Sequence, residues 1–570
     1  MKKPTFKISD LLVLVLIVAL STISFTSAYP ASIPAHGYFI IEGIPIIFWP
    51  AYFILLITNY YFIVSRKVHN VIKILSYYLL SFFALIRMFI TPYVSGIFGS
   101  DSSTYIGLVD YWISNDIINL QETAYGDNPS LFIISKVFNC IAKLNIKYLT
   151  FILALLWVFL IFMAFRLFVL KHQGRHNTVS YDTKIITSWM SLSYFLLTVF
   201  FIVNFQFAPQ SFALVLLILA YLSIYNKSNI TTSDIVLVTI LFLALLVSHP
   251  FMYIFLMTSI GLMYFMLKIT NKLWPIFNKL TRRNLNKAFS KSTLIILIVF
   301  ITSSIIYLLY LAYRLQVKLS DVILRAFKHP LYATALEHYR IIATPLFPEY
   351  HPLYLAITYV VYIGLVILTI YITFFALIGL RIRTCKLYEI SITLAPLIWV
   401  LPSSAILGGL SLRGLQTLLL GLLLLAVHGL TLYRKKHEAM FKKVVTGLIT
   451  LTVLANVKYM WYAHPPYFSD SDITVAELLN DFIIPQGNKI LSHRSLHTYF
   501  NSRFTGNLFT AFTSPYWALI GNVDVSSLWV LWSNKLELES IKHCYPLPKF
   551  SYLVKSRDLV FSSNIAYLLY

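Results

Sequence analysis

Charged residues are scarce in this sequence. Asp, Glu, Lys and Arg together make up 12% of the 570 residues, whereas soluble domains usually carry about 25%. Hydrophobic residues make up 58%, and apolar runs of about 20 residues, enough to cross a hydrocarbon layer roughly 30 Å thick, recur along the chain. The composition therefore excludes an ordinary soluble domain and predicts an integral membrane protein.

Acidic residues are the scarcer charged class. There are 22 of them against 45 Lys and Arg, which gives a formal net charge of +23. Such an excess can indicate a nucleic-acid-binding protein, but here the cations are concentrated in loops that alternate along the chain, as the positive-inside rule requires. We interpret the charge as a signature of topology and of contact with membrane lipid, and we expect no nucleic-acid partner.

Cysteines and common catalytic motifs are also few. Cys140, Cys385 and Cys544 fit neither a disulfide framework nor a metal cluster, although Cys140 and Cys544 both fall outside in the predicted topology, so a bridge between them stays open. No Walker loop, dinucleotide glycine pattern or zinc-protease motif occurs. The predicted cytoplasmic loops are too short for a nucleotide-sugar domain, which favours a lipid-linked substrate used outside.

About thirteen apolar segments are predicted to cross the membrane. The first resembles a signal peptide, but no clean cleavage site precedes a soluble domain, so we expect it to be retained. The predicted spans are approximately residues 10–29, 42–64, 72–91, 149–170, 185–204, 208–225, 234–248, 251–267, 293–312, 353–379, 390–406, 415–433 and 444–463.

Loop charges give the predicted orientation. Seven cations and no acidic residue lie within residues 268–291, which places that loop in the cytoplasm. The amino terminus is then inside and the carboxyl terminus outside, and the two long loops, 92–148 and 313–352, are also outside. The expected localisation is the plasma membrane, with the functional site on the extracytoplasmic side.

The predicted fold class is mainly α. Residues 1–463 form a polytopic membrane helix bundle with its two outer loops, and residues 464–570, which contain no span, form a small extracytoplasmic α/β domain. In that tail we expect a helix over 475–482, a turn at 485–488 and a strand at 489–492. In the first outer loop, residues 129–142 have helical periodicity and are predicted to lie along the membrane interface.

The first outer loop carries the acidic sequence Gly99-Ser100-Asp101-Ser102-Ser103-Thr104-Tyr105. A carboxylate at the mouth of a membrane bundle indicates function, because charge is costly there. Asp101 can deprotonate an acceptor hydroxyl or hold a metal ion. Alternatively, it caps a helix that begins near Ser103. Asp110, nine residues later, is the second catalytic candidate, and it faces a different direction if the segment is helical.

Candidate phosphate-binding residues lie at other outer positions. Arg413 is isolated at the outer end of span twelve, where it can bind a phosphate through two hydrogen bonds or reach lipid headgroups. His249 can bind phosphate, act as acid or base, or cap a helix end. In the second outer loop, Arg314 and Arg340 can receive a lipid phosphate.

On these motifs, the chain resembles the GT-C superfamily of polytopic membrane glycosyltransferases. Residues 99–105 look like the acidic motif of their first outer loop, and Phe207-Ala208-Pro209-Gln210-Ser211-Phe212-Ala213 is similar to a span start of archaeal-type members. Ser248-His249-Pro250 resembles their short His motif, and residues 474–491 look like their outer tail.

The resemblance implies a polyprenyl- or dolichyl-phosphate sugar donor and an extracytoplasmic glycan, lipid or protein acceptor. It also implies Asp101 as the base of an inverting transfer, with basic outer residues such as Arg413 on the donor phosphate. Two motifs of oligosaccharyltransferases are missing from the sequence. The turn between spans five and six has no Asp or Glu, and the tail has no Trp-Trp-Asp motif. These absences argue against an oligosaccharyltransferase and leave a divalent cation, Mg²⁺ or Mn²⁺, open as a cofactor.

Two other functions remain as alternatives. A polysaccharide polymerase of the O-antigen or exopolysaccharide kind also has many spans and outer loops, and Asn128-Pro129-Ser130-Leu131-Phe132 has some likeness to such proteins. A lipid-linked-sugar flippase or transporter would require ionisable residues deep in the spans and internal repeats, and the sequence shows little of either. We therefore rank the glycosyltransferase first.

Overall fold

The computed structural model describes most of the predicted spans and short parts of the remainder. Apart from isolated positions, namely 12, 15, 16, 19 and 309, the described residues are 44–65, 68–84, 97–98, 100–114, 128–143, 146–173, 181–198, 209–225, 230–249, 252–277, 287–307, 352–381, 387–406, 408–434, 438–460, 467–468, 490–491, 512–513, 529–532, 559–562 and 567–569.

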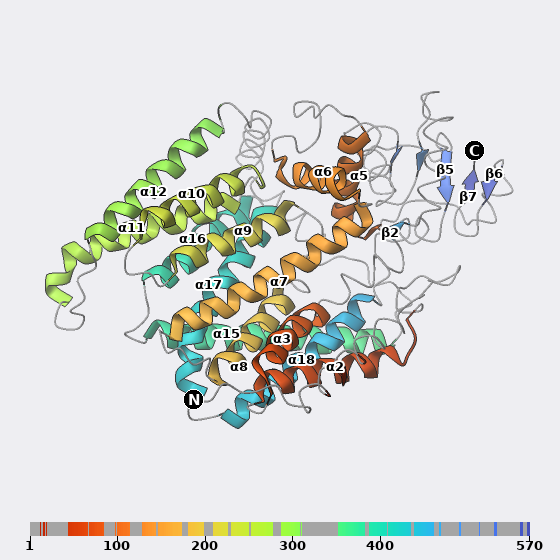
Figure 1. The fold of residues 1–570 in the computed structure, drawn as a ribbon, viewed down its shortest axis with the longest axis horizontal. Coiled ribbons are helices and arrows are strands. Elements are labelled where there is room, and N and C mark those ends of the chain that lie inside the picture. Colours follow the sequence, from red (N-terminus) through yellow and green to blue (C-terminus); the bar gives the residue numbers. More distant parts are fainter. Residues whose placement is uncertain are drawn as a thin grey trace.

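Helices dominate the described residues (Figure 1). They are α2 (Phe48–Val64), α3 (Asn70–Ala84), α5 (Ser100–Ser114), α6 (Ser130–Ala142), α7 (Ile146–Gln173), α8 (Tyr181–Phe195), α9 (Pro209–Ile224), α10 (Thr232–Leu246), α11 (Met252–Phe277), α12 (Lys287–Ile306), α15 (Pro352–Arg381), α16 (Leu387–Ile406), α17 (Gly408–Arg434) and α18 (Glu438–Met460).

The centre of the bundle is α8. The residues from Ile185 in α8 to Thr198 just beyond it are all buried, and α2, α3, α7, α17 and α18 pack around α8. A helix that is covered on every side needs no polar face, so periodicity alone could not distinguish this central helix from a lipid-facing one. The large side chains Trp157, Trp189 and Tyr194 are fully buried in this region.

Apolar side chains also cover part of the outside. On α15, Ile363, Ile367 and Ile370 are 59%, 61% and 63% exposed. Contiguous apolar surface of this kind is suited to lipid or a partner and not to water. Among the described residues, one helix, Pro352–Leu380 within α15, is long and apolar enough to cross a membrane, and the other apolar helices are shorter. The helical bundle agrees with the predicted class, and the count of about thirteen spans stays a prediction.

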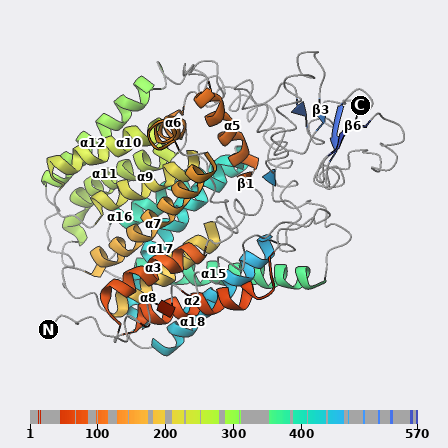
Figure 2. The same cartoon turned by 45° about the vertical axis from the view of Figure 1, so that its right-hand side comes forward.

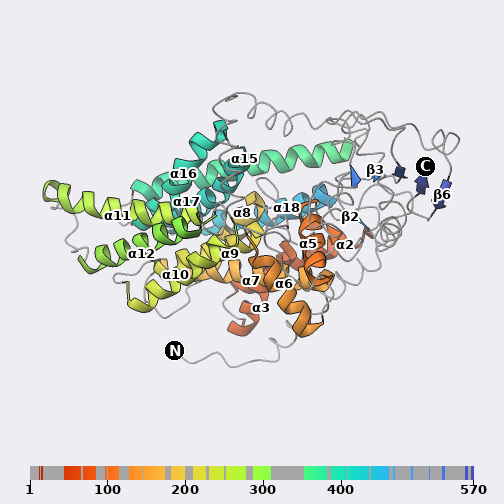
Figure 3. The same cartoon turned by 90° about the horizontal axis from the view of Figure 1, so that it is seen from above.

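The strands lie at one end of the bundle, and α11 and α12 extend to the other end (Figure 3). Strands β4 (Phe512–Thr513), β3 (Ile490–Leu491) and β5 (Trp529–Trp532) are parallel, and β7 (Tyr567–Leu569) and β6 (Leu559–Ser562) extend the sheet in antiparallel fashion, in the order β4-β3-β5-β7-β6. The strand predicted at 489–492 is confirmed as β3. The helix predicted over 475–482 lies outside the described residues.

A second, two-stranded ladder joins the first outer loop to the tail. In β1 (Ile97–Phe98), Ile97 pairs with Phe468 and Phe98 with Tyr467 of β2 (Tyr467–Phe468), in antiparallel register. Because β1 ends two residues before α5 begins, the start of the tail lies beside the start of α5 (Figure 2). We call the end of the bundle that carries α5, α6 and these strands the sheet end, and the other end the basic end.

Glycines let α17 approach its neighbours closely. A Cβ atom built on Gly429 would lie 2.4 Å from the carbonyl oxygen of Phe375 in α15, and one on Gly379 would lie 2.1 Å from the carbonyl oxygen of Leu425 in α17. Small residues at such crossings allow backbones to touch, a recurrent feature of helix packing in membranes.

We expect Gly429→Ala to destabilise the protein, because the new methyl group meets backbone that cannot move unless α15 and α17 separate. Overpacking of this kind costs about 1–3 kcal/mol. The matched control is Gly447→Ala in α18, where an added Cβ meets nothing within 4 Å and the better helix propensity of Ala should leave stability equal or slightly higher. Thermal unfolding of both variants in detergent tests this, and equal midpoints would contradict it.

Two predicted boundaries are wrong. Residues 407–414 were expected to be the outer connection between spans eleven and twelve, but α17 begins at Gly408, so Arg413 is helical. The acidic sequence 99–105 was expected to be a loop, but α5 begins at Ser100. In both cases the polar composition suggested a connection, while tertiary contacts to neighbouring helices extend the helix into it.

Candidate active site

The proposed base stands in the first turn of α5. Ser100 and Asp101 are the first two residues of the helix, residue types that favour a helix start because the first backbone N–H groups lack partners and the positive end of the helix dipole attracts a carboxylate. The alternative in which Asp101 caps a helix that begins near Ser103 does not hold, because the helix already begins at Ser100, three residues earlier. The β1–β2 ladder fixes the chain immediately before Asp101.

The two carboxylate candidates do not share a face of α5. Asp110 follows Asp101 by nine residues, and at 3.6 residues per turn this places the two on opposite sides of the helix. Asp110 is half-buried and makes an interaction of its own. The sequence-based expectation that the two face different directions is therefore confirmed by the helix, and Asp110 does not converge with Asp101 on a single reacting atom.

Hydrogen bonds from Asn128 and Ser130 join the start of α6 to the end of α10. The Ser130 backbone N–H donates to the Val247 carbonyl oxygen at 3.4 Å, and the Ser130 hydroxyl donates to the Ser248 hydroxyl oxygen at 2.6 Å. The Asn128 amide donates to the Leu246 carbonyl oxygen at 3.4 Å. Carbonyls at a helix end lack partners within the helix, so these bonds explain why α6 is held here.

This junction brings together two motifs that are distant in the sequence. Asn128 and Ser130 belong to the sequence 128–132. Ser248 adjoins His249, which is 5% exposed. The Asn128 amide also reaches the Tyr307 hydroxyl oxygen, at 3.3 Å, just beyond α12. His249 makes an interaction of its own. The predicted His motif therefore lies beside the α6 start, as part of a polar junction between three helices.

Two buried polar groups in the α5–α6 layer have no hydrogen-bond partner among the residues that the structure describes. They are the indole nitrogen of Trp112 in α5 and the hydroxyl of Ser135 in α6. The ring of Trp112 lies 5.4 Å from that of Phe132, centroid to centroid. Buried polar groups are nearly always hydrogen-bonded, but atoms of the same kind, such as the Trp189 indole nitrogen and the Tyr194 hydroxyl, occur elsewhere in the bundle, so these two do not by themselves mark a binding site.

A third polar contact stands at the start of α9. The amide of Gln210, in the first turn, donates to the side-chain oxygen of Gln416 in α17 at 2.9 Å. Arg413 precedes Gln416 by three residues, so the two positions lie one above the other on α17. The structure thus places the Arg413 position one helical turn from the head of α9. Gln210 belongs to the sequence 207–213 that carries part of the family resemblance.

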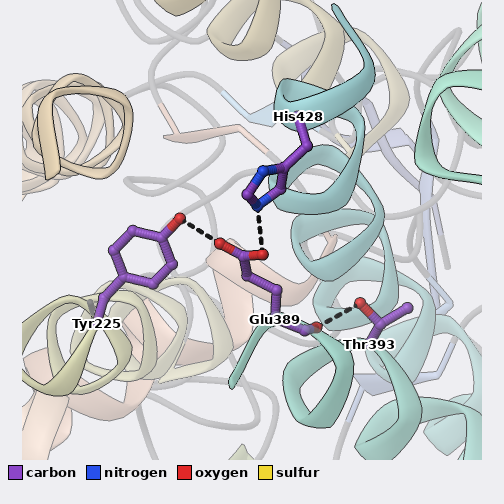
Figure 4. Close-up of polar contacts among 4 residues, drawn as sticks. All are labelled: Tyr225, Glu389, Thr393 and His428. Carbon is purple, nitrogen blue, oxygen red and sulfur yellow. Dashed lines mark hydrogen bonds and ion pairs between the residues drawn. The ribbon is translucent and has the colours of Figure 1, made fainter. Parts of the chain in front are cut away.

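The sequence analysis missed a buried acidic residue, Glu389 in the first turn of α16. Its carboxylate accepts a hydrogen bond from the Tyr225 hydroxyl at 2.7 Å and lies 2.5 Å from the His428 ring nitrogen Nε2 (Figure 4). The neighbouring Tyr388 hydroxyl donates to the carbonyl oxygen of Tyr221. A lone Glu beside an apolar span was the available signal; its partners come from α9 and α17, far along the chain.

This cluster joins α9, α16 and α17 at the basic end, away from α5. Both carboxylate oxygens of Glu389 have a partner, and the residue is 0% exposed. A flippase would use ionisable groups that change partners along a path, whereas this group is fully paired inside the helix contact. We interpret it as a structural contact and not as part of the candidate active site.

Several predicted residues are not placed. Arg314 and Arg340 lie outside the described residues. In the part of the chain that the structure describes, no three His, Cys, Asp or Glu residues gather as metal ligands. Cys140 is exposed and free, while Cys385 and Cys544 lie outside the described residues.

In the comparisons with known proteins, the matches come from solved structures. No protein-family model matches the chain, and neither does any curated protein. Among solved structures, the chain is similar to ArnT from Cupriavidus metallidurans bound to undecaprenyl phosphate, with 9% sequence identity and a TM-score of 0.41, over 85% of this chain and 96% of ArnT.

Proposed function

We propose that the protein is a membrane glycosyltransferase of the GT-C type, which transfers a sugar from a polyprenyl-phosphate carrier to an extracytoplasmic acceptor. One observation supports this most strongly. Three sequence features lie at the sheet end, namely the acidic helix α5, the His249 motif and the Gln210 motif. They are spread over more than a hundred residues of the sequence. A transferase that acts at one membrane face needs its polar groups at one end of the bundle, and a scaffold function does not.

In the proposed reaction, an acceptor hydroxyl attacks the anomeric carbon of the donor sugar and inverts it. Asp101 takes the proton of that hydroxyl as the new glycosidic bond forms. The bond from the anomeric carbon to the phosphate oxygen breaks, and the carrier phosphate leaves with the electron pair. Arg413 is suited to that phosphate because a guanidinium presents two parallel donors, and His249 is the second candidate for the same phosphate.

The proposed function is tested by transfer in membranes. Membranes that contain the protein are supplied with labelled polyprenyl-phosphate sugars, and the label is followed from the carrier to a water-soluble or lipid-extractable acceptor, with and without a metal chelator. Transfer above that of membranes lacking the protein supports the proposal. Growth of a glycan ladder from a lipid-linked repeat unit would favour the polymerase instead, and movement of label across the bilayer without transfer would favour the flippase.

A further inference from the structure

Two cations belong to the helices that form the packed seam between α3 and α7, each within about one turn of Tyr77. Lys73, in the first turn of α3, is 6% exposed, and Arg166 of α7 is half-buried. The Arg166 guanidinium carbon lies 5.9 Å from the centre of the Tyr77 ring, within the range of a cation–π contact. The Tyr77 hydroxyl is hydrogen-bonded to Ser188 of α8, so the ring has a fixed position.

The two helices run in opposite directions, and this brings the cations together. Tyr77 contacts Phe162 with ring centroids 5.2 Å apart, and Tyr78 contacts Phe159 at 4.9 Å. Lys73 precedes Tyr77 by four residues, and Arg166 follows Phe162 by four. In antiparallel helices both steps lead along the seam in the same direction, by about 6 Å. The backbone positions of Lys73 and Arg166 therefore both lie about one turn from the Tyr77–Phe162 contact towards the basic end, and the Arg166 guanidinium extends back to the Tyr77 ring.

Among the helices around these two cations, α8 contributes one carboxylate, Asp182 in its first turn, and the structure does not describe that side chain. The sequences of α2, α3 and α7 contain neither Asp nor Glu, and no ion pair joins Lys73 or Arg166 to another described residue. The next cation along α7, Lys171, donates a hydrogen bond to the Leu222 carbonyl oxygen at 2.7 Å. Charges placed between packed helices are costly unless an anion pairs with them.

We propose that Lys73 and Arg166 form a binding site for a phosphate group at the basic end of the bundle. A guanidinium supplies paired donors and an ammonium a point charge, a combination suited to phosphate oxygens. Basic pockets between helices on the cytoplasmic side typically receive lipid headgroups, and the predicted topology places this end there. The shared chemistry is a phosphate ester, from an anionic lipid or from a soluble molecule. The site lies at the opposite end from α5, and it does not depend on the proposed transfer.

The test compares Lys73→Gln, Arg166→Gln and the double variant with the wild type. The matched control is Lys458→Gln, because the Lys458 ammonium also lies over a ring, 4.4 Å from the centre of Tyr362, but near the end of α18 at the sheet end. Binding of phosphatidylglycerol to the purified full chain is titrated in phosphatidylcholine nanodiscs by native mass spectrometry. We expect the affinity to fall roughly fivefold for each cation removed, and to stay unchanged in the control.

Competition with inorganic phosphate separates the two sources. Lipid binding that resists inorganic phosphate assigns the site to a headgroup, and binding of inorganic phosphate that displaces the lipid assigns it to a soluble ester. Equal lipid affinity of the wild type and the double variant, or an equal loss in Lys458→Gln, would overturn the proposal. Lys73→Arg, which keeps the charge, should retain binding, and its loss at an unchanged unfolding temperature would also count against the site.

Discussion

Asp101→Asn is expected to reduce sugar transfer by about 10²–10⁴-fold, the range that a positioned general base contributes. The asparagine has nearly the same shape and still suits a helix start, so α5 should form as before. What it cannot do is accept the proton of the acceptor hydroxyl. The measurement is the initial rate of label transfer at equal amounts of wild-type and variant protein in membranes.

The matched control for this change is Asp234→Asn. Asp234 also stands in the first turn of a helix, α10, where its carboxylate accepts hydrogen bonds from the Thr231 backbone N–H at 3.0 Å and the Thr231 hydroxyl at 2.8 Å. It lies at the basic end, so its loss should affect stability slightly and transfer not at all. Equal rates for wild type and Asp101→Asn would remove Asp101 from catalysis and direct the search to Asp110 or to the loop 313–352.

Glu389→Ala is expected to lower the free energy of unfolding by about 2–6 kcal/mol, because two buried hydrogen-bonding groups lose their partner at about 1–3 kcal/mol each. The change leaves the Tyr225 hydroxyl and the His428 ring without their partner in a region closed to solvent, where both residues are under a tenth exposed. Because these groups come from α9 and α17, all three helix contacts weaken together. Thermal or denaturant unfolding in detergent measures the loss.

Two comparison variants make that result specific. Glu389→Gln keeps a carbonyl oxygen for Tyr225 and an amide for His428, so it should lose much less stability than Glu389→Ala. Thr393→Val removes a hydroxyl one turn away that donates only to the Glu389 backbone carbonyl oxygen, at 2.8 Å, and should cost about 1 kcal/mol. If Glu389→Ala cost no more than Thr393→Val, the cluster would not be a structural contact.

Helix positions were predictable where the sequence alone supplies the reason. Long apolar runs make a helix the only backbone that satisfies its own hydrogen bonds away from water, which is why the segments expected over 234–248 and 444–463 appear as α10 and α18. The helix predicted over 129–142 appears as α6, since its periodicity came from a face packed on the bundle. Helix ends were less predictable, as the extension of α17 to Gly408 shows.

The candidate site was only partly predictable. The sequence supplied Asp101, His249 and Arg413 as candidates by residue type and by their place at span ends, and their roles stay predictions. It could not show that Ser130 bonds Ser248, or that Gln210 bonds Gln416, because those pairs are 118 and 206 residues apart. It also could not show that Glu389 has a partner, since His428 stands 39 residues away on another helix.

The sequence by itself determined the class of this protein. The class follows from local properties, namely scarce charge, recurrent apolar runs and cations in alternate loops. The free energy of placing each segment in lipid or in water depends on its own residues more than on the rest of the fold. Only the tertiary structure decided which polar groups meet. Hydrogen bonds and ion pairs act over about 3–4 Å, so only the folded chain places the start of the tail beside α5 through the β1–β2 ladder, encloses Glu389 with His428 and Tyr225, and sets Arg166 over the Tyr77 ring.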